Sequence, residues 1–174
     1  FVPDGVAVPV RPYRTQAVVV DMPALRDWNG DLPMGWLPED RVYFRPMRRG
    51  QVLIGGFAEA VDDPETASRD ADPDFRRHVA DLVPRRFSDT EGAELVDGWA
   101  GVDLATPDTR PLIDSPPEAP SGLVLATGFH GRGIMTAPVA SAAVRARLTG
   151  ETAPFPLEPF AMERFDDPSP DFPF

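Results

Sequence analysis

The 174-residue chain contains no cysteine and no lysine. Without cysteine it can form no disulfide, zinc–thiolate site or iron–sulfur cluster, and it has no thiol nucleophile. Its hydrophobic runs are far shorter than the roughly 20 residues that a membrane-spanning helix requires, so we expect no membrane span. Any chemistry therefore depends on other side chains or on the backbone.

Positive charge is also scarce. All 17 basic residues are arginines, 28 residues are acidic, and the net charge is −11. Nucleic-acid binding requires a basic stripe, and these arginines are scattered among carboxylates, so we expect no nucleic-acid partner. An acidic, lysine-free composition is typical of proteins from salt-saturated cytoplasm. We therefore predict a cytoplasmic, halophilic protein of haloarchaeal source, with a charge-driven function such as binding a basic partner as the alternative.

Hydrophobic residues make up 42% of the chain, and the 22 prolines and 14 glycines stay below the share that marks disorder. Hydrophobic periodicity and turn residues predict an α+β fold with a mixed, mainly antiparallel sheet. Asp72 or Asp74 is available to cap the first helix, and Thr136 to cap the second. The expected strands are 6–21, 41–47, 51–57, 94–103, 111–114 and 122–127, and the expected helices are 74–87 and 136–148.

A glycine-rich loop between the last expected strand and the last expected helix carries the clearest chemical signal. Glycines let a backbone turn sharply and approach a ligand, and the amide N–H groups at a helix N-terminus attract negative charge. The glycines at 128, 131 and 133 do not form G-x-G-x-x-G, so the loop is no independent dinucleotide site. The pattern alone leaves two interpretations open, an anion- or cofactor-binding loop and a tight turn without a ligand.

Four segments in order resemble the C-terminal region of flavoproteins of the D-amino-acid oxidase family, which includes glycine oxidases, sarcosine oxidases and dimethylglycine dehydrogenases. They are PVRPYRTQ at 9–16, the hairpin at 42–56, WAGVDLATPDTRPLID at 99–114, and the strand, glycine loop and helix at 123–148. The resemblance extends from about residue 9 to residue 165. It implies a strand–loop–helix segment that completes a flavin-binding domain.

The resemblance also implies a cofactor, FAD, contacted by the glycine loop through its backbone amides. The expected cofactor-binding residues are Gly128, Phe129, His130, Gly131, Arg132, Gly133, Ile134 and Met135. By the same resemblance, residues 1–98 are substrate-domain strands and a helix, 99–150 contact the flavin, and 151–174 form a Pro/Phe-rich tail. Taken alone, a histidine in the position of His130 is more often an exposed loop residue, and His78 is expected to face solvent.

Members of this family begin with a βαβ unit whose G-x-G-x-x-G loop holds the ADP portion of FAD, and no such motif occurs here. The chain begins at Phe1, without a methionine. We therefore expect the C-terminal half of a longer enzyme, with the N-terminal nucleotide-binding half as its missing partner. On its own the chain is expected to be inactive and colourless.

The first hairpin strand carries the expected substrate-side residues, Tyr43 and Arg45, which share a face by period-two spacing. A phenol orients an amine or carboxylate and a guanidinium clamps a carboxylate, although both are also ordinary strand residues. Some amino-acid-oxidising relatives place a carboxylate-binding arginine at Asp103, and sarcosine-oxidase-like members place a lysine at Met135 and a flavin-linking cysteine near Gly101. Covalent flavin of that kind is excluded, so FAD is expected to be non-covalent.

The resemblance thus implies a FAD-dependent oxidoreductase that oxidises a C–N bond of a small amine or amino acid by hydride transfer. No metal site is expected, because the acid pairs at 62–63 and 166–167 lack spaced ligands. The alternative is a non-catalytic module that keeps the substrate-domain fold, binds no flavin and contacts a partner through its tail. A βαβ unit encoded in frame upstream of Phe1 supports the enzyme.

Overall fold

The computed structural model describes residues 6–27, 33–116, 119–165 and Phe172. The chain divides into two compact units. We call Arg14–Val102 the sheet unit, and Phe1–Tyr13 together with Asp103–Phe174 the terminal unit. Within the described ranges, no helix combines the length and the apolar character that crossing a membrane requires.

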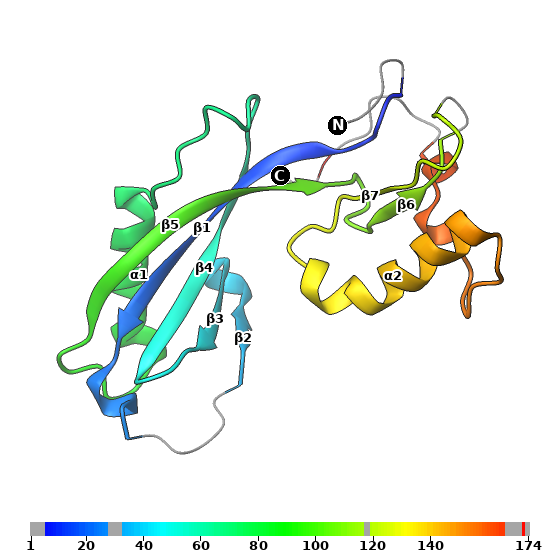
Figure 1. The fold of residues 1–174 in the computed structure, drawn as a ribbon. Coiled ribbons are helices and arrows are strands. Elements are labelled where there is room, and N and C mark those ends of the chain that lie inside the picture. Colours follow the sequence, from blue (N-terminus) through cyan, green and yellow to red (C-terminus); the bar gives the residue numbers. More distant parts are fainter. Residues whose placement is uncertain (1–5, 28–32, 117–118, 166–171, 173–174) are drawn as a thin grey trace. The chain divides into compact units, whose positions relative to one another are not determined.

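A five-stranded sheet with the order β2-β3-β4-β1-β5 dominates the sheet unit (Figure 1). β2 pairs antiparallel with β3, and β3 with β4, so the predicted hairpin is confirmed. The strands are β1 (Arg11–Asp21), β2 (Gly35–Leu37), β3 (Val42–Pro46), β4 (Gln51–Ala60) and β5 (Glu94–Ala105). The boundaries between the units fall within β1 and β5. The mixed, mainly antiparallel sheet with helices agrees with the predicted fold class.

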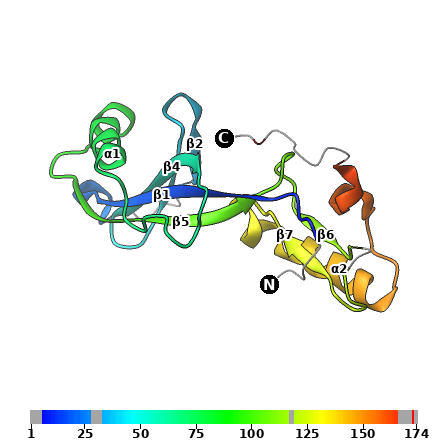
Figure 2. The ribbon, with the colours of Figure 1, turned by 90° about the horizontal axis from the view of Figure 1, so that it is seen from above.

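Helix α1 (Pro73–Arg86) covers one face of this sheet (Figures 1 and 2). The predicted helical spacing is confirmed, because the apolar side chains repeat every three or four residues and all face the sheet. Phe75, Val79 and Leu82 are fully buried and pack with Val18 and Ile54 in the main core. Burial of this stripe, at about 25 cal/mol per Å² of apolar surface, is what holds the helix to the sheet.

The helix start differs from the cap expected from the sequence. Asp72 occupies the N-cap position, but its side chain makes no capping bond. The carboxylate instead accepts hydrogen bonds from Arg14 and from Gln16. Pro73 at the first helical position lowers the need for a cap, since it has no amide N–H.

His78 is the second correction, because it does not face solvent. Its imidazole is half-buried on α1, with the ring centroid 4.8 Å from that of Phe57 and Nε2 3.2 Å from the carbonyl oxygen of Asp40. The sequence predicts no strand or helix between residues 22 and 40, yet the described part of this region contains β2 and two short 3-10 helices, Pro23–Leu25 and Pro38–Asp40. β2 is only three residues long, too short to show an alternating pattern.

The terminal unit contains a two-stranded antiparallel sheet, β6 (Leu112–Asp114) and β7 (Leu125–Thr127), and the helix α2 (Gly133–Thr149) (Figure 1). Ile113 of β6 packs with buried alanines of α2 and with side chains of the following tail. The tail forms two 3-10 helices, Glu158–Phe160 and Met162–Arg164.

The last strand and the last helix of this unit both begin at other residues than expected. The apolar run at 122–127 forms a strand only over its last three residues, and Ala126 there is exposed. α2 begins at Gly133 rather than near Thr136, which is therefore not a cap. The Thr136 hydroxyl instead donates to the carbonyl oxygen of Arg132, within the first turn of the helix.

Candidate functional site

The loop from β7 to α2 begins at a glycine that no other residue can replace without strain. Gly128 has φ +69°, a left-handed conformation, and it is buried. A Cβ atom at this position would lie 2.6 Å from Cγ2 of Thr106, which is itself fully buried. Steric space and backbone conformation therefore both require glycine here.

The next residues are tied to the end of β5. Phe129 forms an antiparallel bridge with Ala105, and the amide N–H of His130 donates to the carbonyl oxygen of Leu104 at 3.2 Å. His130 has φ 48° and Gly131 has φ 73°, so two successive residues are left-handed. A histidine in this conformation is uncommon, and the surrounding bonds hold it there.

The Asp103 carboxylate lies beneath this turn. One of its oxygens, Oδ2, accepts hydrogen bonds from the amide N–H of Gly131 at 2.6 Å and from the hydroxyl of Tyr13 at 3.0 Å. The other, Oδ1, accepts the amide N–H of Leu104 at 2.7 Å. The Asp103 carboxylate therefore places a negative charge next to the start of the loop.

His130 is partly buried beside Tyr13, with ring centroids 5.0 Å apart. Burial, and then the positive charge of Arg132, lower the pKa of the His130 imidazole below its ordinary value, against an opposing effect of Asp103. The imidazole is therefore uncharged at neutral pH. The expected reading of His130 as a merely exposed loop residue does not describe this environment.

The turn at Thr106, Pro107 and Asp108 has Asx-type geometry, because Oδ1 of Asp108 accepts the amide N–H of Arg110 at 3.0 Å. The buried Thr106 hydroxyl lies 2.6 Å from the carbonyl oxygen of Arg110 and 3.1 Å from Oδ1 of Asp108. Arg164 forms an ion pair with Asp108 at 3.0 Å. Burial raises the pKa of the Asp108 carboxyl, but the bonds from Arg164 and from the amide of Arg110 outweigh it, and the pKa lies below its usual range.

The first turn of α2 presents backbone donors to open space. Among the described residues, no acceptor is found for the amide N–H groups of Gly133, Ile134 and Met135. Ile134 is 96% exposed and Met135 70% exposed. A Cβ at Gly131 would meet nothing nearer than the Tyr13 hydroxyl at 3.7 Å, and one at Gly133 nothing nearer than Phe129 at 3.8 Å.

These features fit a flat cofactor with an electron-rich edge. The backbone at Gly131 and Gly133 is open to close approach, and the donors lie at the N-terminus of a 17-residue helix, whose dipole favours negative charge. The guanidinium of Arg132 adds a positive charge next to these donors, and it donates a hydrogen bond to the Thr109 hydroxyl at 2.9 Å. The loop residues can therefore hold an anionic or polarised ring edge through backbone groups.

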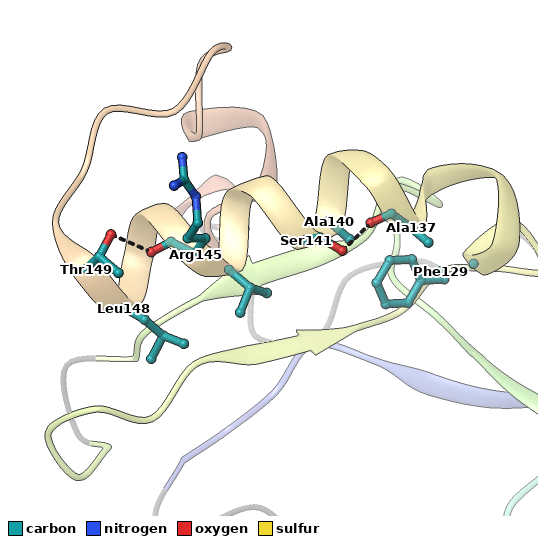
Figure 3. Close-up of a pocket in the computed structure, with 9 residues that line it drawn as sticks. Phe129, Ala137, Ala140, Ser141, Arg145, Leu148 and Thr149 are labelled. Atoms are coloured by element: carbon teal, nitrogen blue, oxygen red, sulfur yellow. Dashed lines mark hydrogen bonds between the residues drawn. The ribbon is translucent and has the colours of Figure 1, made fainter.

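An apolar groove of about 580 Å³ follows the length of α2 (Figure 3). The small side chains of Ala137, Ala140 and Ser141 form its floor near the loop, next to the ring of Phe129. Val144 and Leu148 continue it toward the end of the helix. On the same helix, Ala143 and Ala146 are buried while Ala137 is exposed.

Tyr43 and Arg45 lie in the sheet unit, on β3, whereas the loop residues belong to the terminal unit. Tyr43 is paired with Trp36 on β2 and with Gly55 on β4. The absence of a side chain at Gly55 gives the Tyr43 ring its place, because a Cβ there would lie 2.4 Å from Cζ of the ring. Burial raises the pKa of the Tyr43 phenol, and the charge of Arg45 opposes it.

Sequence reasoning missed two aromatic residues near the candidate site: Trp36, which is paired with Tyr43, and Tyr13, which contacts Asp103. Trp36 is 59% exposed beside Tyr43, but β2 is too short to be recognised. Tyr13 stands in a quoted motif, yet its contact with Asp103 joins residues 90 positions apart, which no local pattern reveals. Asp103 itself was noticed only as a departure from relatives.

Comparison with known proteins decides the family. The model of the family described as "FAD dependent oxidoreductase" matches residues 2–147. The chain belongs to the FAD dependent oxidoreductase family.

Among curated relatives of this FAD dependent oxidoreductase domain, a glycine oxidase of Pseudomonas putida is 29% identical over 159 residues, covering 91% of this chain and 40% of the relative. A glycine oxidase of Pseudomonas aeruginosa is 28% identical, with 91% and 41% covered. The chain thus spans about two fifths of the length of these two relatives.

Solved structures show the same fold. The glycine oxidase of Geobacillus kaustophilus superposes with a TM-score of 0.69 at 25% identity, covering 90% of this chain and 40% of that one. The L-proline dehydrogenase of P. horikoshii superposes with a TM-score of 0.72 at 24% identity, covering 93% and 42%, and this second likeness concerns the fold alone.

Proposed function

We propose that this chain forms the substrate-side and flavin-contacting part of an enzyme that oxidises a C–N bond of a small amine or amino acid, with non-covalently bound FAD. The observation that carries the proposal is the first turn of α2. Three backbone amides without an acceptor among the described residues adjoin an open glycine backbone there. The family match and the glycine oxidase relatives support the choice of cofactor and substrate class.

Within this proposal, the residues from Gly128 to Met135 hold the flavin. Gly131 and Gly133 allow close approach, and the amides of Gly133, Ile134 and Met135 donate to the ring edge that is most electron-rich. Bound FAD would supply the acceptor for the hydride that leaves the carbon beside the nitrogen. The chain has no cysteine for attachment through sulfur, which supports non-covalent binding.

Tyr43 and Arg45 are the proposed substrate-side residues. They share one face of β3, and Trp36 pairs with Tyr43 on the same face. A phenol donates to or accepts from an amine, and an exposed guanidinium attracts a carboxylate. The Tyr43 hydroxyl remains protonated at neutral pH, because burial raises its pKa above the ordinary value of a phenol.

The proposal includes an N-terminal nucleotide-binding half, because the chain spans only about two fifths of the length of two glycine oxidases that it resembles. The test has two arms. First, the coding sequence upstream of Phe1 is expected to encode an in-frame βαβ unit with G-x-G-x-x-G. Second, the 174-residue chain alone is expected to purify colourless, whereas the protein from the whole gene carries FAD at one per chain. A whole-gene product without flavin contradicts the proposal.

The rival function, a module that contacts a partner through its Pro/Phe-rich tail, has less support. Phe155 and Phe160 of the tail are partly buried against the core of the terminal unit, with ring centroids 6.1 Å apart, which leaves less of each ring for a partner. We also propose a cytoplasmic, high-salt setting and a haloarchaeal source, on the basis of the net charge of −11 and the absence of lysine.

A further inference from the structure

Asp103 joins three parts of the terminal unit through one carboxylate. Oδ2 receives the Tyr13 hydroxyl at 3.0 Å and the Gly131 amide at 2.6 Å, and Oδ1 receives the amide of Leu104 at 2.7 Å. The bond to Leu104 fixes the side-chain orientation, so Oδ2 is held toward the loop. We call Asp103, Tyr13 and Gly131 the Asp103 cluster.

A carboxylate is the side chain that satisfies all three donors. An asparagine has one carbonyl oxygen and an NH₂ group, so turning the oxygen toward Tyr13 and Gly131 would set NH₂ against the Leu104 amide, donor against donor. Hydrogen bonds to a charged acceptor are also shorter and stronger than neutral ones. The geometry therefore requires the negative charge as well as the oxygen positions.

The Asp103 cluster decides which amides of the loop remain available. His130 and Gly131 are both left-handed, and their amide N–H groups are taken by β5, through the Leu104 carbonyl oxygen and the Asp103 carboxylate. The later amides, from Gly133 to Met135, have no acceptor among the described residues. Removing the bond to Gly131 therefore frees a left-handed glycine within this turn.

We propose that Asp103 is a positioning residue for the flavin-contacting loop, and that its fixed negative charge lowers the reduction potential of the flavin held there. The inference rests on the proposed function. A negative charge beside a group that gains electrons disfavours that gain.

The first experiment uses the 174-residue chain itself, with amide hydrogen exchange followed by NMR. In Asp103→Ala, exchange at the Gly131 amide is expected to accelerate by at least about tenfold, the loss of one charge-assisted hydrogen bond. Amides of the β6–β7 pair in the same terminal unit keep their protection, which shows that this unit is folded in the variant. Unchanged protection at Gly131 would overturn the positioning role.

The second experiment uses the FAD-loaded protein from the whole gene, with the flavin midpoint potential as readout. Asp103→Asn is expected to raise the potential by about 30 mV or more, a tenfold change for a two-electron couple. Tyr13→Phe, which keeps the charge, should loosen Gly131 without a comparable rise. The matched control is Asp97→Asn on the same strand, since among the described residues the exposed Asp97 carboxylate bonds only to the amide of Gly98.

The outcomes separate the two proposals. If the whole-gene protein holds no FAD, the proposed function fails and this inference fails with it. If FAD binds but Asp103→Asn leaves the potential unchanged, or shifts it no more than Asp97→Asn does, this inference alone is wrong. A rise confined to Asp103→Asn, together with faster exchange at Gly131 in Asp103→Ala, supports it.

Discussion

Arg14 is the residue whose loss should most weaken the sheet unit. Its side chain is 5% exposed, and its five N–H groups all have acceptors. Nε donates to the carbonyl oxygen of Ser68 at 2.9 Å, and Nη2 to that of Asp70 at 2.6 Å. The remaining donors bind the carboxylates of Asp72 and Glu59, at distances from 2.7 to 3.0 Å. One guanidinium thus secures the acidic segment that leads into α1.

We expect Arg14→Met to lower the free energy of unfolding by about 2–3 kcal/mol. Breaking a fully buried ion pair costs about 3–5 kcal/mol, because one charge is left buried and unpaired. Here the partners regain water, since the side chains of Asp72 and Glu59 are 44% and 54% exposed. The penalty is therefore smaller than for a buried pair, yet well above the roughly 0–1 kcal/mol of a surface pair.

Urea unfolding followed by circular dichroism measures this change, with Arg77→Met as the matched control. Arg77 pairs with Asp74 on the exposed face of α1, with side chains 69% and 86% exposed, so its loss should cost under about 0.5 kcal/mol. A double-mutant cycle with Asp72→Asn should give a coupling energy of about 1 kcal/mol or more. Equal effects of Arg14→Met and Arg77→Met, or a coupling energy near zero, would refute the reasoning.

Three further predictions concern pH, glycine and salt. The hydrogen bond from Arg14 lowers the pKa of the Asp72 carboxyl, so the contribution of this carboxylate to stability is present above its unfolded pKa of about 3.9 and is lost as the pH falls through the lower folded value. In acid unfolding, the stability of Arg14→Met should therefore change less with pH in that window than the stability of the unchanged chain, and equal slopes would contradict this. Gly128→Ala should destabilise the terminal unit by about 2 kcal/mol or more, because its Cβ would lie 2.6 Å from Thr106 at a positive φ, whereas Gly101→Ala, with no atom within 4 Å, should change stability by under about 0.5 kcal/mol; thermal unfolding of the two variants decides. The melting temperature of the chain should rise from low to molar KCl, since salt screens the repulsion of a net charge of −11, and a flat or falling trend would remove the argument for halophilic adaptation.

Local patterns predicted the elements whose own residues carry the signal. The hairpin of β3 and β4 lies within the expected ranges or extends them by three residues, and α1 differs from expectation by one residue at each end. The expected division at residues 98 and 150, and the roles of the candidate site residues, stay predictions. β2 and the first turn of α2 escaped detection, because three-residue strands and glycine-led helix starts leave no period to read.

The sequence by itself determined the α+β class, the location of the glycine loop and the absence of thiol chemistry, since each follows from residue type and spacing along the chain. Only the tertiary structure decided that Asp72 serves Arg14 rather than capping α1, and that Asp103 binds Gly131 and Tyr13. These bonds join residues 58, 28 and 90 positions apart. A hydrogen bond depends on atoms within about 3 Å and on their direction, and for residues so far apart only the folded backbone sets both.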